Sequence, residues 1–140
     1  MTSPKLYPAI DLGPLPVSLI NHALGTELES GHARLSKAAH QQMAIDHPAD
    51  YPVCIAELAA TIASPTFIGQ SQRHGRNFEM IRRIGRADGS VVLVAIGLEP
   101  DRSGDYRIRT CYLLDAGTLE QRRQRGHLKL VVPRQIKGPA

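Results

Sequence analysis

The sequence has few aromatic residues and almost no cysteine. Two of its 140 residues are phenylalanine, four are tyrosine and none is tryptophan. Because 42% of the residues are hydrophobic, we expect an aliphatic core built from isoleucine, leucine, valine and alanine. The pattern of aromatic residues by which RNA-recognition-motif domains stack bases is missing.

The residue clusters that usually hold metals or phosphates are also missing. Cys54 and Cys111 are the only cysteines, they form no CxxC pair, and we expect buried free thiols. The chain has no HExxH motif, no glycine-rich phosphate loop and no GxSxG elbow. The sequence therefore predicts neither a metal site nor a cofactor.

Long hydrophobic runs are absent. The longest apolar stretch, residues 91–97, is too short to cross a bilayer, and the first residues lack the pattern of a secretory signal. We expect no membrane association and a cytoplasmic place of action. A length of 140 residues fits a single domain.

Positive charge is concentrated in the second half of the chain. Lysine and arginine number 17 against 13 acidic residues, and the formal net charge is +4. Arginine, whose planar fork matches phosphate oxygens, predominates over lysine there. This favours an anionic partner such as nucleic acid, and a solvated basic surface is the alternative.

Proline and glycine divide the first part of the chain from the rest. We expect residues 1–33 to form an arm that docks partly, with a short helix over 16–24, and residues 34–140 to form the main domain. Ser36 is placed to cap a helix that ends near Asp46, before Pro48. Asp50 is placed to cap a second helix. In that helix one buried stripe is expected, consisting of Ile55, Leu58, Ala59 and Ile62.

The pattern then changes to that of strands. Residues 78–85, 90–98 and 106–114 are expected to be strands, with a hairpin turn at 87–89. A short helix over 119–125, capped by Thr118, and a last strand over 127–132 follow. The predicted class is α+β, with N-terminal helices packed on an antiparallel sheet whose central strand is 90–98.

Two histidines in the first helix are candidates for proton transfer. His40 and His47 are seven residues apart, which places them on one helix face about 10 Å apart along the axis. Both can exchange a proton near neutral pH, as phosphodiester cleavage requires. Surface or capping roles are the alternative, and 10 Å is a long separation for two groups that serve one phosphate.

The strand over 106–114 carries further candidates. Thr110 and Tyr112 should share one face, with Arg107 and Arg109 on the other. Either arginine could neutralise a phosphate or pair with Glu79 or Glu99 on a neighbouring strand. The remaining candidates for binding RNA phosphate are basic residues of a strand and of the C-terminal segment: Arg82, Arg83, Arg122, Arg123 and Lys129.

Read in order, several stretches resemble the phage-associated barnase–EndoU–colicin–RelE-like (BECR) nuclease domains. These stretches are DLGPLPVSLINHALG, ARLSKAAHQQMAIDHPADY, ASPTFIGQSQRHGRNFEMIRRI, VVLVAIGLEP, YRIRTCYLLD and TLEQRRQRGHLK. They cover roughly residues 8 to 130. The specificity lies in their order and spacing.

The resemblance implies a metal-independent RNA endonuclease that acts as a toxin or phage effector. Attack by the ribose 2′-OH would leave a cyclic phosphate, with His47 and His40 as acid–base groups and Arg109, Thr110 and Tyr112 around the reacting phosphate. The implied partners are RNA, with tRNA as one candidate, and a cognate immunity protein or antitoxin. The alternative is a non-catalytic module of the same fold that binds nucleic acid or protein.

Overall fold

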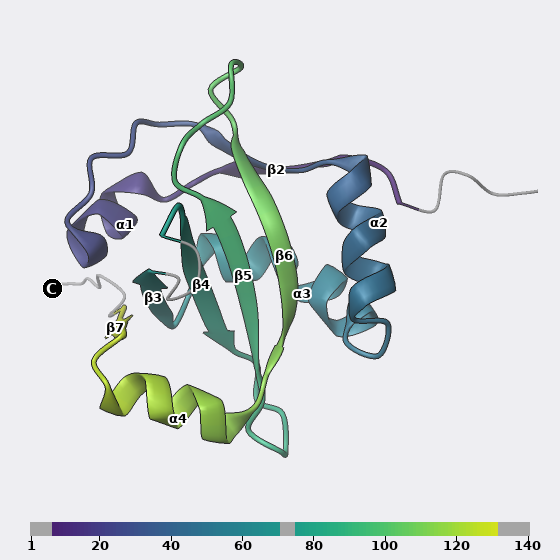
Figure 1. Cartoon of the computed structure of the whole chain (residues 1–140), viewed down its shortest axis with the longest axis vertical. Coiled ribbons are helices and arrows are strands. Elements are labelled where there is room, and N and C mark those ends of the chain that lie inside the picture. Colours follow the sequence, from purple (N-terminus) through teal and green to yellow (C-terminus); the bar gives the residue numbers. More distant parts are fainter. Residues whose placement is uncertain (1–6, 71–74, 132–140) are drawn as a thin grey trace, which may run out of the picture.

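The computed structural model describes residues 7–70 and 75–131. Within these ranges the chain forms four helices and seven strands (Figure 1). The strands are β1 (Ile10–Pro14), β2 (His32–Leu35), β3 (Phe67–Gln70), β4 (Asn77–Arg83), β5 (Val91–Gly97), β6 (Tyr106–Leu114) and β7 (Leu128–Leu130). The helices are α1 (Val17–Leu24), α2 (Lys37–Asp46), α3 (Tyr51–Ala63) and α4 (Ala116–Gln124).

All seven strands belong to one sheet, in the order β1-β2-β6-β5-β4-β3-β7. Strands β2 and β6 are parallel, and every other neighbouring pair is antiparallel. The predicted α+β class with a mostly antiparallel sheet is confirmed. So is the central position of β5, whose seven residues are all buried, as its uninterrupted apolar run predicts.

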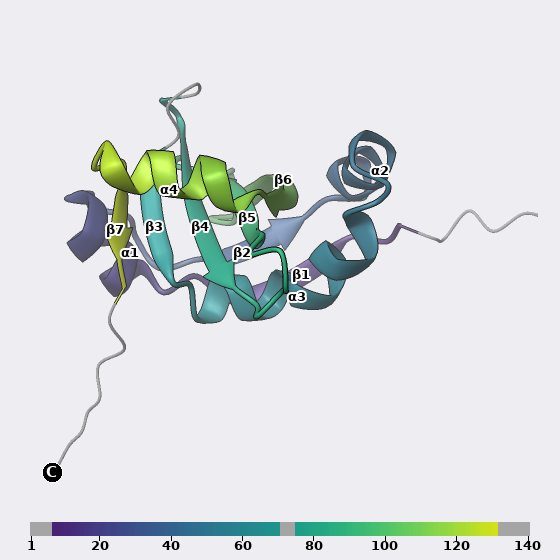
Figure 2. The same ribbon diagram turned by 90° about the horizontal axis from the view of Figure 1, so that it is seen from below.

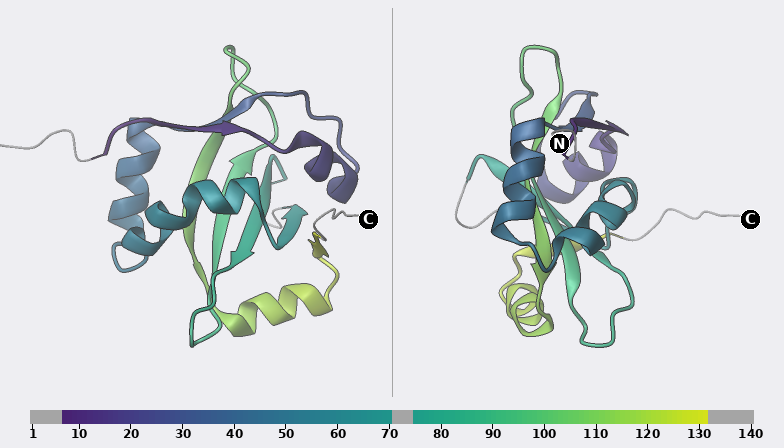
Figure 3. Two further views of the ribbon diagram at one scale, coloured as in Figure 1. Left: turned by 180° about the vertical axis from the view of Figure 1, so that it is seen from behind. Right: turned by 90° about the vertical axis from the view of Figure 1, so that its right-hand side faces the viewer.

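Helices cover the two faces of the sheet unequally. Helix α3 crosses one face and α1 packs on the same side, whereas α4 crosses one end of the opposite face (Figures 2 and 3). The larger hydrophobic cluster lies on the α3 face and includes Ile20, Leu58 and Val94. The smaller cluster lies on the α4 face and includes Phe67, Leu93 and Leu119. The rest of the α4 face is left for polar side chains.

Three strands are not predicted from the sequence. Strands β1 and β2 lie before α2, and β3 follows α3, so the order is not helices first and sheet afterwards. Ile20 and Ala33 are fully buried, so the segment expected as a partly docked arm contributes to the core. Residues 1–6 of that arm, residues 71–74, and 132–140, which include the expected end of the last strand, lie outside the described residues.

Helix caps were predicted with mixed success. Ser36 caps α2 by accepting a hydrogen bond from the amide of Ala39, as expected. The cap of α4 is Asp115, not Thr118: its carboxylate accepts the Thr118 amide at 2.8 Å and the Thr118 hydroxyl at 2.9 Å. Asp50 precedes α3 as expected, but its carboxylate accepts from the amide of Leu113 on β6.

The buried stripe of α3 is also shifted from the prediction. Ala59 is exposed, and the buried positions are Cys54, Leu58, Thr61 and Ile62. Cys54 and Cys111 are buried free thiols, as expected. A hydrogen bond to Cys54, together with burial, raises the pKa of the Cys111 thiol, so this thiol stays protonated and is a poor nucleophile.

Candidate functional site

A groove of about 1190 Å³ opens on the α4 face of the sheet, beside the helix. We call it the α4 groove. Strands β4 and β6 supply its floor, and α4 with the loop that follows it supplies one wall. The polar side chains that line it are Arg76, Asn77, Glu79, Arg109, Thr110, Tyr112, Thr118, Gln121, Arg122, Arg125 and His127.

A β-bulge brings Arg109 into the groove. Ala95 of β5 pairs with Thr110, but the next residue, Ile96, pairs with Ile108, so Arg109 has no partner across the strand pair. Such an extra residue interrupts the alternation of side chains between the two faces. The expectation that Arg109 faces away from Thr110 and Tyr112 is therefore wrong, because all three line the same groove.

A buried ion pair lies at the wall of the groove. The Glu79 side chain is 7% exposed, and its Oε1 accepts a hydrogen bond from Nη1 of Arg122 on α4 at 2.5 Å. The guanidinium of Arg122 compensates the carboxylate for hydration that it loses on burial. From the sequence, Glu79 is expected to pair with a strand arginine if it pairs at all, whereas its partner comes from α4.

The other arginines of the groove have no acidic partner in the described part of the chain. Arg76, Arg109 and Arg125 line the groove, and no described carboxylate lies within 4.0 Å of their guanidinium groups. With Arg122 neutralising Glu79, the groove carries excess positive charge. It is therefore suited to an anionic ligand, and guanidinium groups favour phosphate.

His127 reaches the groove at the turn between α4 and β7. Its amide donates to the carbonyl of Arg122 at 3.0 Å, and Gly126 before it has a φ of +74° that favours glycine. Gly69 of β3 lies directly beneath this turn: a Cβ there would lie 2.5 Å from the His127 carbonyl oxygen. The absence of a side chain at Gly69 lets β7 approach and fixes the position of His127.

The structure does not bring His40 to the groove. Its ring is 2% exposed, its Nδ1 lies 2.7 Å from the carbonyl oxygen of Pro8, and its Nε2 lies 2.6 Å from the hydroxyl of Tyr51. Burial is also the main cause that raises the pKa of Tyr51. His40 therefore fastens the N-terminal segment to α2 and α3.

His47 does not line the groove but packs against a residue that does. It ends α2, and its ring centroid is 5.1 Å from that of Tyr112, with an angle of 34° between the planes. Tyr112 lines the groove, and His47 is not among the lining residues.

The predicted phosphate-binding residues are spread over several surfaces. Only Arg122 lines the α4 groove. Arg83 and Arg123 both lie over the ring of Phe67, at 5.1 and 5.4 Å from its centroid. Arg82 faces α3, where it donates to the carbonyl of Ser64. The fifth residue, Lys129, is on β7 beside α1.

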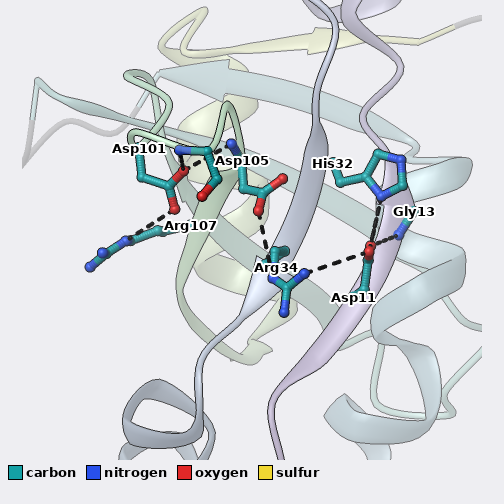
Figure 4. Close-up of polar contacts among 8 residues, drawn as sticks. Asp11, Gly13, His32, Arg34, Asp101, Asp105 and Arg107 are labelled. Carbon is teal, nitrogen blue, oxygen red and sulfur yellow. Dashed lines mark hydrogen bonds and ion pairs between the residues drawn. The ribbon is translucent and has the colours of Figure 1, made fainter.

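Beyond the groove, the α4 face ends in a network of opposite charges. Arg107 lies 3.9 Å from Asp101, and Arg34 lies between Asp105 at 3.7 Å and Asp11 at 3.8 Å (Figure 4). A further ion pair joins Asp11 to His32 (Figure 4). Acidic side chains thus accompany the basic ones in this network, whereas Arg76, Arg109 and Arg125 of the groove have no such partner among the described residues.

No group of three or more metal-ligating side chains occurs among the described residues. Residues 7–70 and 75–131 also contain no helix with the length and apolar character needed to span a bilayer. Comparison of the chain with protein-family models, curated proteins and solved structures finds no match.

Proposed function

We propose that the protein is a metal-independent RNA endonuclease whose active site is the α4 groove. The observation that carries this proposal is the convergence of a buried carboxylate, a histidine and several arginines on one groove. These are the groups that cleavage through the neighbouring 2′-OH requires: a base, an acid and cations for the phosphate oxygens. The resemblance to BECR nuclease domains, with a role as toxin or phage effector, is part of the same proposal.

Each group has one role in the proposed reaction. The Glu79 carboxylate takes the proton of the ribose 2′-OH, and the 2′ oxygen attacks the adjacent phosphorus. The bond from phosphorus to the 5′ oxygen breaks, and the imidazolium of His127 protonates the leaving oxygen. The products are a 2′,3′-cyclic phosphate and a 5′-hydroxyl. Arg109 stabilises the charge on the phosphorane oxygens, Arg122 joins it once the Glu79 carboxylate has been protonated, and Thr110 donates a hydrogen bond to one of these oxygens.

The proton-transfer role goes to His127 rather than to His47 or His40 because of position. A general acid must reach the reacting atoms within hydrogen-bond distance or through one water. His127 lines the groove. Both ring nitrogens of His40 have partners in the core, and the ring of His47 packs on Tyr112.

The test is cleavage of a fluorescent RNA oligonucleotide by purified protein in the presence of EDTA. Positioned proton transfer is worth about 100- to 10,000-fold, so Glu79→Gln and His127→Ala should each slow cleavage by that order. The product should carry a cyclic phosphate by mass spectrometry. An oligonucleotide with 2′-deoxyribose throughout should resist cleavage.

Arg107 supplies a matched control for the arginines. It lies two residues before Arg109 on β6 but is paired with Asp101 outside the groove. Arg109→Ala should slow cleavage strongly, and Arg107→Ala should leave it near the parent rate, with circular dichroism as the folding control. Cleavage that needs a divalent ion would contradict the mechanism. If the parent binds RNA but cuts none, the protein is a binding module instead.

A further inference from the structure

The aromatic pair at one end of the α4 groove has no role in the cleavage step. Tyr112 is half-buried and lines the groove, and the ring of His47 packs against its ring at 5.1 Å. We propose that Tyr112 is the stacking platform for an unpaired base of single-stranded RNA, and that His47 is a positioning residue that holds this platform. The inference rests on the proposed function for the identity of the ligand as RNA.

Hydrogen bonds of the turn between α2 and α3 hold His47 in its place beside Tyr112. The carbonyl of His47 accepts hydrogen bonds from the amides of Asp50 and Tyr51, at 3.1 and 3.0 Å. The Asp50 carboxylate in turn accepts from the amide of Leu113, the residue after Tyr112, at 3.0 Å. The backbone of the turn that carries His47 is thus tied to β6 next to Tyr112. Because the neighbouring His47 is held in place, the Tyr112 ring loses little conformational entropy when a base stacks on it.

The platform also lies close to the phosphate-binding groups. Tyr112 is two residues beyond Thr110 on the same face of β6, and two strand residues span about 7 Å. Arg109, displaced by the bulge, lines the same groove. A strand of RNA whose phosphate contacts Arg109 and Thr110 can therefore place a neighbouring base on Tyr112.

Stacking distinguishes single-stranded RNA from duplex RNA and depends little on the base sequence. Every base offers an aromatic face, and single-stranded RNA exposes it, whereas bases in a duplex are already stacked on their neighbours. The groove should accordingly bind single-stranded RNA of varied sequence and discriminate against the same sequence in a duplex.

The experiment measures binding of a labelled 2′-O-methyl RNA tetranucleotide, which cannot undergo attack by its 2′ oxygen, by fluorescence anisotropy. A matched tetranucleotide without bases carries the same phosphates. Loss of one stacked base costs about 1–3 kcal/mol, or about 5- to 160-fold in affinity. Tyr112→Leu should weaken binding of the normal tetranucleotide by this factor and leave binding of the abasic one unchanged.

Conservative variants distinguish a loss of base stacking from a loss of the folded structure. Tyr112→Phe and His47→Phe keep the paired rings and should retain affinity, whereas His47→Ala should weaken only the base-containing ligand. If Tyr112→Leu weakens both ligands equally, or neither, there is no base platform. Since these assays require no cleavage, a base-dependent loss in a protein that cuts no RNA would refute the proposed endonuclease and leave the platform standing.

Discussion

The imidazole of His40 is buried with both nitrogens bonded, to the Pro8 carbonyl and to the Tyr51 hydroxyl. A histidine that fits the pattern of a catalytic residue is here a structural one. Removing it leaves the Pro8 carbonyl and the Tyr51 hydroxyl without this partner and opens a cavity between α2 and the N-terminal segment. Both effects act on stability and not on the chemistry of a groove elsewhere on the sheet.

We therefore expect His40→Ala to lower the free energy of unfolding by about 2–5 kcal/mol, measured by urea denaturation. RNA cleavage by the protein that remains folded should continue. His22→Ala is the matched control, because His22 is exposed on α1 and should change stability by less than about 0.5 kcal/mol. Equal stabilities of the two variants would contradict the structural role.

Strand β7 is short, and its pairing depends on a close approach between its backbone and that of β3. Among the described strands its three residues pair only with β3, and Gly69 of β3 leaves room for the His127 carbonyl at the start of this pairing. A methyl group at Gly69 must push the turn away. The turn carries His127, so an effect on packing becomes an effect on the proposed active site.

Gly69→Ala should cost about 1–3 kcal/mol of stability, as overpacking typically does, and should slow RNA cleavage by displacing His127. Gly75→Ala is the control for stability alone, because a Cβ at Gly75 meets no atom within 4 Å, whereas Gly75 itself lines the groove. Thermal unfolding and the cleavage rate are measured together. A stable Gly69→Ala protein with full activity would show that β7 can shift without moving the histidine.

The elements that the sequence predicts well are those with a strong local signal. The apolar run of β5, the strand β6 and the Ser36 cap of α2 were all predictable, because hydrophobic pattern and capping chemistry depend on neighbouring residues. Strands β2 and β3 have four residues each, too few to show a period. Their strand conformation comes from pairing with distant segments.

The site was harder to predict than the fold, because it too depends on pairing between distant segments. Alternation along β6 places Arg109 on the wrong face, because a bulge depends on the register with β5. The sequence suggests only Arg107 or Arg109 as a partner for Glu79, whereas its partner in the structure is Arg122 of α4, 43 positions away. His127 could have been found only by weighing the histidine in the basic segment as highly as those in the first helix.

For the whole molecule, the acidic side chains predict how stability depends on pH. The pKa values of four aspartates lie below the ordinary 3.8, chiefly because each carboxylate accepts a backbone hydrogen bond: Asp11, Asp88, Asp101 and Asp115. A lowered pKa in the folded state contributes stability above the unfolded value, and that stability is lost as pH falls through the folded value.

The melting temperature should accordingly change little through these groups above about pH 5 and fall steadily below about pH 4. Differential scanning calorimetry between neutral and acidic pH measures this. Asp115→Asn keeps an acceptor for the α4 cap but removes a charge, so its deficit relative to the parent should shrink in acid. A deficit that grows in acid would reverse the sign of this linkage.

The order of residues along the α4 groove has a consequence for how the protein is made. All of its lining residues lie between Gly75 and His127, and the wall formed by α4 comes last. A nascent chain that has emerged from the ribosome as far as β6 holds the floor of the groove but lacks Arg122, Arg125 and His127. A cell that translates this protein therefore meets the complete groove only late in synthesis, after the central strands are available to fold.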